Sequence, residues 1–189
     1  MVTLDTKAKI KELMRIWKKH PELNVRACFV MEQRDPPSDP EASAEAMARI
    51  LAATPKLSIT GFSLEPLGMR IKNGLRHADV YPEAFRAQRD AMLLPGALNG
   101  FEAARAWLRP YHKTRACHVS ARALKHDAAD DGVGYVTAGV FIAAALAEGF
   151  RVKRRNVGSD GLININEDEL FTRAMKRLNE RHPALRATA

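Results

Sequence analysis

The chain has 189 residues, and 46% of them are hydrophobic, which is enough for a buried core in one generous domain or two small ones. Its 30 Lys and Arg residues outnumber 22 Asp and Glu residues and give a formal net charge of +8. This excess of positive charge favours nucleic acid, an acidic protein or another anionic surface as a partner.

The cysteines and the apolar stretches indicate the compartment. Cys28 and Cys117 are too few and too far apart for a small disulfide-stapled domain, so we expect a reducing, cytoplasmic environment. The longest weakly polar stretch, residues 133–146, is shorter than the roughly 20 residues that a membrane helix needs. The first residues carry scattered charges, unlike a secretory signal. We therefore expect no membrane partner.

The first predicted elements are a helix and a strand. Apolar residues at helical spacing, among them Ile10 and Trp17, predict an amphipathic helix over residues 6–20. Residues 25–31 have the pattern of a buried strand. A proline-rich connection then ends at Asp39, a suitable helix cap, with Pro40 at the first helical position.

The helix after Pro40 should bury its apolar side chains Met47, Ile50 and Leu51. The next predicted elements are a strand over residues 56–64, a loop or irregular hairpin over residues 65–78 and a helix over residues 82–94.

The turn-forming sequence Leu94-Pro95-Gly96 is the predicted boundary between two subdomains. Residues 1–95 would form an N-terminal α+β subdomain with a short mixed sheet. Residues 96–189 would form a C-terminal helical subdomain that carries a basic β-hairpin. The predicted fold class is therefore α+β and mainly helical.

Cap signals predict four helices in the C-terminal half, beginning near Asn99, Ser120, Thr137 and Asn166. A Glu follows three residues after the first and the last of these caps, as in a capping box. The second helix should end in the acidic turn of residues 127–132. The third is almost entirely apolar and should be buried, with Gly149 at its end.

Positive charge is concentrated in two blocks. Residues 103–126 contain six basic residues and no acidic one, and residues 151–155 contain four more. In chain order these residues are Arg105, Arg109, Lys113, Arg115, Arg122, Lys125, Arg151, Lys153, Arg154 and Arg155.

The second block lies in a predicted β-hairpin over residues 149–166. Alternation along a strand places Arg151, Lys153 and Arg155 on one face, and Phe150 and Val152 on the other. Such a ribbon can point its cations at one phosphate backbone. The same pattern is equally typical of an exposed edge strand whose charges prevent aggregation.

The partner strand of the hairpin has a matching pattern. Ile163 and Ile165 would join the buried face, and Asn164 would join the basic one. The hairpin is thus expected to have one apolar and one polar face.

The helix that Ser120 begins carries a second basic face. Arg122, Lys125 and His126 are spaced by three and four residues and therefore share that face. Together with the hairpin it could hold a duplex in a winged-helix-like arrangement. The helix directly before the hairpin has no basic or amide side chain to contact a base edge. We therefore expect at most phosphate-dominated or shape-dependent binding, or else a fold in which this apolar helix is central and the topology is only superficially winged.

We find no catalytic or metal-binding pattern in the sequence. Gly132 and Gly134 do not have the spacing of a nucleotide-binding loop. Cys117 and His118 are adjacent, so their side chains would point to opposite faces of a strand. His112, His118 and His126 lack the paired spacing of a zinc site. We therefore expect no enzymatic activity, no cofactor and no bound metal.

The expected function is non-enzymatic nucleic-acid binding by a regulatory or accessory factor, with DNA favoured over RNA. The first-choice phosphate contacts are Arg151, Lys153 and Arg155, followed by Arg122, Lys125, Lys113 and Arg115. The alternative is a protein-interaction module, such as an adaptor or inhibitor of a nucleic-acid-processing machine, whose basic surface docks an acidic partner. Trp107, Tyr111 and Arg109 have the composition of an interface anchor, although such a Trp is more often part of a core.

Overall fold

The computed structural model describes residues 37–62, 82–155 and 160–181. Within these ranges the protein is an α+β fold with two small antiparallel sheets. Its elements are α3 (Pro40–Ala53), β1 (Leu57–Ser58), β2 (Gly61–Phe62), α5 (Pro82–Asp90), the 3-10 helix η1 (Ala91–Leu93), α6 (Pro95–Leu108), β3 (Val119–Ser120), α7 (Ala121–Ala128), the π-helical turn η2 (Ala129–Val133), α8 (Ala138–Ala147), β4 (Val152–Arg154), β5 (Gly161–Ile163) and α9 (Glu167–Arg181). The elements predicted over residues 6–20, 25–31 and 65–78 lie outside the described residues.

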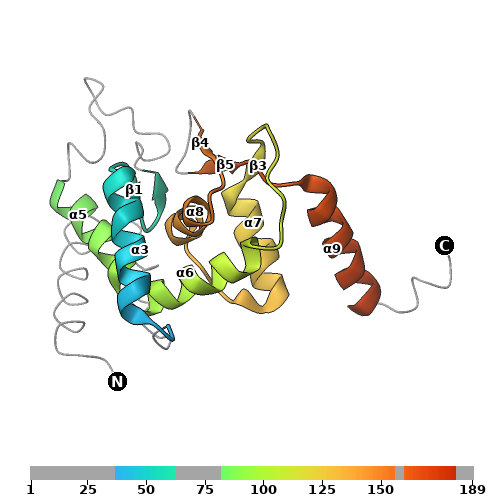
Figure 1. The fold of residues 1–189 in the computed structure, drawn as a ribbon, viewed down its shortest axis with the longest axis horizontal. Coiled ribbons are helices and arrows are strands. Elements are labelled where there is room, and N and C mark those ends of the chain that lie inside the picture. The colour runs from blue at the N-terminus through green and yellow to red at the C-terminus, as the bar shows by residue number, and fades with distance from the viewer. Residues whose placement is uncertain (1–36, 63–81, 156–159, 182–189) are drawn as a thin grey trace.

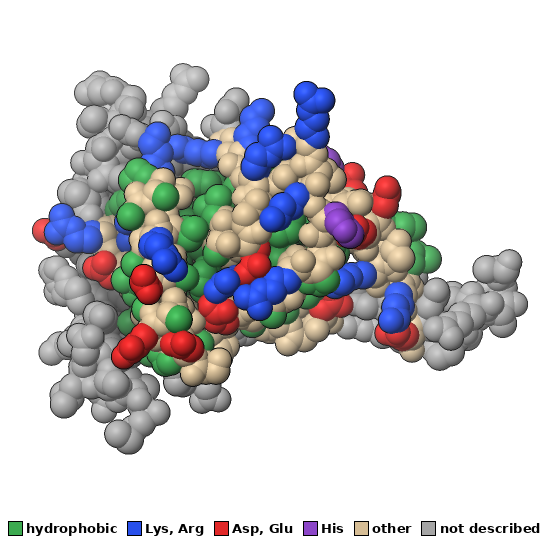
Figure 2. All heavy atoms as spheres, in the orientation of Figure 1, with side chains coloured by type: hydrophobic (Ala, Val, Ile, Leu, Met, Phe, Trp, Pro, Cys, Tyr) green, Lys and Arg blue, Asp and Glu red, His purple; other side chains and the backbone are tan. Residues whose placement is uncertain are grey.

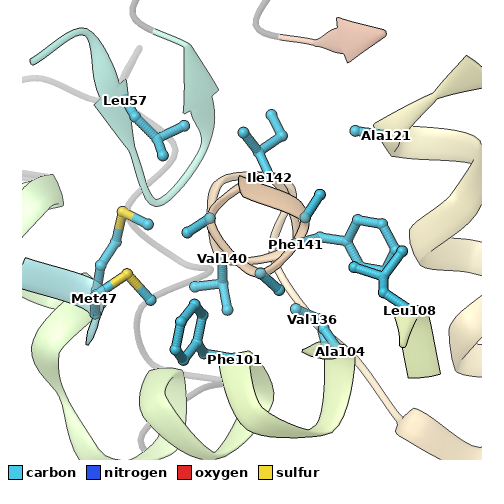
Figure 3. Packing of buried hydrophobic residues seen from close by; sticks show 14 of the residues in the cluster. Met47, Leu57, Phe101, Ala104, Leu108, Ala121, Val136, Val140, Phe141 and Ile142 are labelled. Atoms are coloured by element: carbon cyan, nitrogen blue, oxygen red, sulfur yellow. The ribbon is translucent and has the colours of Figure 1, made fainter. Parts of the chain in front are cut away.

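Helix α8 forms the centre of the protein, with α3, α6, α7 and the β1–β2 pair around it (Figure 1). It begins at the predicted cap, Thr137, whose hydroxyl accepts a hydrogen bond from Val140 N at 3.4 Å. Residues 139–145 are all buried, and Figure 3 shows Phe101 and Leu108 of α6 pointing toward them. Burying one large apolar side chain such as Phe141 stabilises the fold by roughly 1.5–3 kcal/mol.

Helix α3 begins as the sequence predicts. Asp39 Oδ1 accepts a hydrogen bond from Ala42 N at 3.0 Å, and Pro40 occupies the first turn. Met47 and Leu51 are buried in the core, where α3 packs against α6 and α8.

The single strand predicted over residues 56–64 is wrong, because the chain reverses within it. β1 and β2 form a short antiparallel pair in which Leu57 lies opposite Phe62 and Ser58 lies opposite Gly61. Gly61 has φ 112°, a conformation that residues with a Cβ rarely adopt. The Ser58 hydroxyl donates to the Gly61 carbonyl at 3.2 Å and stabilises the reversal.

Residues 94–96 lead directly into a helix. Leu94 is extended, and Pro95 occupies the first turn of α6, where its missing N–H costs no hydrogen bond. Helix α6 therefore starts four residues before the predicted cap, and the capping box of Asn99 and Glu102 is wrong. The predicted helix over residues 82–94 is present as α5 followed by η1.

The core contains side chains from both sides of this boundary. Met47 and Leu57 precede it, Phe101 and Phe141 follow it, and all four belong to one buried cluster. The division into two subdomains stays a prediction.

Helix α7 also follows its sequence signals. The Ser120 hydroxyl accepts a hydrogen bond from Ala123 N at 3.2 Å, and the helix gives way to the acidic turn η2, where Gly132 has φ 92°. Among the described helices, none is by itself both long and apolar enough to cross a membrane, and the nearest stretch is divided between Ala121–Val133 and Ala138–Ala147, which are bent by 85°.

The second sheet has three strands in the order β3-β5-β4. The sequence predicts β4 and β5 but not β3, which has two residues. Ile163 is the Cα partner of both Val119 and Val152, and this row faces the core, because Ile163 is fully buried. Leu162 is the partner of both Ser120 and Lys153, and this row lies on the opposite face.

Candidate functional site

The outer face of β4 presents basic side chains to solvent. Arg151, Lys153 and Arg155 are exposed, whereas Phe150 is buried and Val152 is half-buried, which is the alternation that the sequence predicts. The side chain of Lys153 has no ion pair or hydrogen bond with any residue that the structure describes. Figure 2 shows Lys and Arg side chains along the upper edge of the molecule, where Figure 1 draws β4 and the segment before β3.

Arg151 holds the segment of residues 112–118 against the sheet. Its Nη2 donates to the carbonyls of Thr114, at 3.3 Å, and of Arg115. Its own carbonyl accepts a hydrogen bond from Cys117 Sγ at 3.5 Å. Arg151 is therefore a structural residue as well as an exposed cation.

Asn164 completes this attachment. Its amide oxygen accepts from Arg151 N at 2.6 Å, and its amide nitrogen donates to the Thr114 carbonyl at 2.7 Å. Asn164 lies beside Arg151, as the predicted alternation requires, but it is only 3% exposed, because its side chain is bonded between the backbones of Arg151 and Thr114. A buried amide needs partners of this kind to offset its lost hydration.

The same segment brings two predicted cations beside Arg151. Lys113 and Arg115 are both exposed. The Lys113 Nζ lies 5.3 Å from the ring centroid of Phe150, so its stem follows the edge of the sheet. The structure thus places Lys113, Arg115 and Arg151 together.

Asp160 joins the β4–β5 pair to helix α7. Its carboxylate is buried and accepts three hydrogen bonds, from Ser120 Oγ at 2.6 Å, Gly161 N at 2.9 Å and Arg122 N at 3.1 Å. Arg155 Nη1 lies 4.0 Å from the same carboxylate. The negative charge at the start of α7 also complements the helix dipole. Asp160 therefore contacts both the backbone N–H of Arg122 and the side chain of Arg155.

Helix α7 carries the remaining predicted cations. Arg122 and His126 are exposed, and Lys125 is half-buried, with its Nζ 5.0 Å from the ring centroid of Tyr135. Burial lowers the pKa of Lys125, and the neighbouring charge of Arg122 lowers it further. Tyr135 is itself 46% exposed, so a polar ring lies beside these cations.

Sequence reasoning missed Asp160 and the role of Asn164. Asp160 precedes a glycine, which by itself indicates only a turn. The partners of both residues lie far away in the sequence, so no local pattern reveals them.

The aromatic residues that suggested a protein interface are part of the core. Trp107 and Tyr111 are buried, and their ring centroids are 4.8 Å apart. Trp107 Nε1 donates to Asp131 Oδ2 at 2.8 Å, and Arg109 Nε lies 3.3 Å from Glu148 Oε1. Neither ring is available as an exposed anchor.

Within the part of the chain that the structure describes, no group of three or more His, Cys, Asp or Glu side chains is placed to hold a metal ion. Comparison of the chain with models of known families, with curated proteins and with solved structures found no match in any of the three.

Proposed function

We propose that this protein binds nucleic acid by contacting phosphates, as a non-enzymatic regulatory or accessory factor. The contact surface, which we call the basic surface, consists of Lys153 on β4, Arg151 and Arg155 directly before and after it, Lys113 and Arg115 before β3, and Arg122 and Lys125 on α7. The observation that carries the proposal is the exposure of Arg151, Lys153 and Arg155, alternate residues that ideal strand geometry would space by about 6.6 Å. Cations that share a face can contact one backbone together.

The order of the elements supports a winged-helix-like use of this surface. Helix α6, strand β3, helices α7 and α8, and strands β4 and β5 follow one another, and all three strands form one sheet. A duplex would lie against α7 and the β4–β5 pair, which Asp160 holds together.

Because α8 is buried, it limits how much base sequence this protein could recognise. In a winged-helix-like arrangement the helix before the hairpin usually enters the major groove, but here its residues 139–145 are in the core. We therefore expect little dependence on base sequence and a strong dependence on salt, with DNA bound ahead of RNA.

The test is fluorescence anisotropy of labelled double-stranded and single-stranded DNA and RNA at two salt concentrations. Lys153→Ala/Arg155→Ala should weaken binding and reduce the slope of log affinity against log salt by roughly 0.9 for each lost phosphate contact. The matched control is Arg49→Ala/Arg86→Ala, which removes two exposed arginines from α3 and α5.

Equal affinity in the two double variants would refute the basic surface as the phosphate site. An absence of wild-type binding to every nucleic acid at low salt would refute the function itself. In that case the same cations would be a docking face for an acidic protein or a charged sheet edge.

A further inference from the structure

Helix α9 is attached to the rest of the protein mainly through its first two turns (Figure 1). His112 Nδ1 lies 2.5 Å from Glu169 Oε1, Leu170 packs against the core, and the guanidinium of Arg173 lies 4.2 Å from the ring centroid of Tyr111. The helix has 15 residues and is therefore about 22 Å long, so much of it extends away from these contacts.

The side of α9 opposite these contacts exposes an apolar face. Phe171 is 67% exposed and Met175 is 39% exposed, and a spacing of four residues places them on the same face of the helix. Ala174, a small residue, lies between them in the sequence and allows a second backbone to approach closely. Phe171 is the most exposed of the large hydrophobic residues described in the structure. An exposed apolar face bordered by charges is typical of an interaction surface.

The charges along α9 are divided by sign. The first turn carries Glu167, Asp168 and Glu169, whereas residues 170–181 contain four basic residues and one acidic one. The described basic side chains of that later part are Arg173, which lies over the Tyr111 ring of its own chain, and Lys176, whose exposed Nζ lies 3.9 Å from Glu180 Oε1. A second copy of the same helix, lying antiparallel, would place each acidic turn beside the basic part of the other copy. A parallel copy would place the two acidic turns together.

We propose that the exposed face of α9 pairs with α9 of a second copy of this chain, in antiparallel orientation, to form a two-fold symmetric dimer. Each Phe171 and Met175 then packs against the partner helix, and each acidic first turn faces the partner's bases. Such an interface is self-complementary, as a closed two-fold dimer requires. The proposal is independent of nucleic-acid binding, because the basic surface and the exposed face of α9 have no residue in common.

The first test is sedimentation velocity of the full chain over a wide concentration range. The wild type should show a monomer–dimer equilibrium, and Phe171→Glu should weaken the dimer by about tenfold or more, since buried aromatic residues dominate interfaces. Ala48→Glu is the matched control, because it adds the same charge at an exposed position on another helix, α3. Circular dichroism spectra that match the wild type show that both variants fold.

A wild type that stays monomeric at all concentrations would overturn the proposal, and it would leave another segment of the chain or another protein as the occupant of the face. Equal weakening by Phe171→Glu and Ala48→Glu would also overturn it.

The orientation has its own test. Asp168→Asn should weaken an antiparallel dimer several-fold, because it removes attraction to the partner's bases; Glu167 is left unchanged, since it lies 3.3 Å from His118 Nε2 of its own chain. The same variant would strengthen a parallel dimer, because it removes repulsion between the two acidic turns. A stronger dimer would therefore overturn the antiparallel arrangement.

Discussion

The backbone of Gly139 touches the backbone of Ser58: a Cβ on residue 139 would lie 1.7 Å from the Ser58 carbonyl oxygen. In addition, Gly139 N donates to the Ile59 carbonyl at 3.1 Å. The β1–β2 pair thus rests directly on the first turn of α8, at a position where there is no room for a side chain.

Gly139→Ala should therefore be strongly destabilising. The added methyl group meets backbone rather than a mobile side chain, so the pair must separate from α8, at a cost of about 3 kcal/mol or more. Urea denaturation measures this loss. Gly132→Ala is the control, because a Cβ there has no neighbour within 4 Å and only its φ of 92° is strained; it should lose about 1 kcal/mol. Equal losses in both variants would contradict the close contact.

Asp160→Ala should loosen the connection between the β4–β5 pair and α7. The Ser120 hydroxyl and two backbone N–H groups lose their acceptor, and unsatisfied buried donors cost roughly 1–3 kcal/mol. Thermal denaturation should show a lower midpoint for this variant. Glu45→Gln, which alters an exposed ion pair on α3, should change stability by less than about 0.5 kcal/mol. A midpoint for Asp160→Ala that matches this control would count against the role of Asp160.

The start of α9 should detach in acid. The backbone N–H of His112 donates to Glu169 Oε2 at 3.0 Å, and this bond, together with the His112 ring, holds the pKa of Glu169 below its ordinary value of 4.5. A carboxyl group with a lowered pKa contributes stability that is fully present above 4.5 and is lost as the pH falls through its folded-state pKa.

Glu169→Gln should remove this component of the pH dependence. Between about pH 5 and pH 3, the thermal midpoint of the wild type should fall more steeply than that of the variant. Parallel curves for the two proteins would show that Glu169 is not coupled to folding in this way.

Arg151→Lys should separate the two roles of Arg151. The variant keeps the positive charge but loses the guanidinium that reaches the carbonyls of Thr114 and Arg115. Hydrogen exchange in residues 112–118 should become about tenfold faster or more, since a hydrogen bond to a charged group contributes roughly 1.5–3 kcal/mol. Lys153→Ala, on the same face, should leave this exchange unchanged. Unaltered exchange in Arg151→Lys would mean that other contacts hold the segment.

Local signals in the sequence predicted much of the helical structure. Asp39, Ser120 and Thr137 each cap a helix at the expected residue, because a cap bonds to an N–H only three residues away. Asn166 also lies at the start of α9 as predicted, and its Oδ1 accepts a hydrogen bond at 3.0 Å from Asp168 N, two residues away. By contrast, the boundary predicted at residues 94–96 treats Pro95 as a break, although proline is equally suited to the first turn of a helix.

The sequence predicts only the part of the candidate site that depends on the alternation of side chains along a strand. The exposed face of β4 follows from the two-residue repeat of side chains along a strand. In contrast, β3 is a strand only because it pairs with β5, which lies more than forty residues later in the chain. Asp160 and Asn164 are likewise defined by partners that the fold brings to them. The clusters of positive charge in the sequence thus indicate the candidate basic surface. Hydrogen bonds between segments far apart in the sequence, made by Asp160 and Asn164, explain how the backbone under that surface is held in place.

The contact between β1–β2 and α8 also bears on synthesis. Helix α3 and the β1–β2 pair leave the ribosome long before α8 has been made, so Met47 and Leu57 at first lack the helix that buries them. Folding of these early elements must then wait for translation of the later one. A nascent chain arrested before Ala138 is expected to remain open to proteases throughout α3, and one released after α8 and the later strands should become resistant.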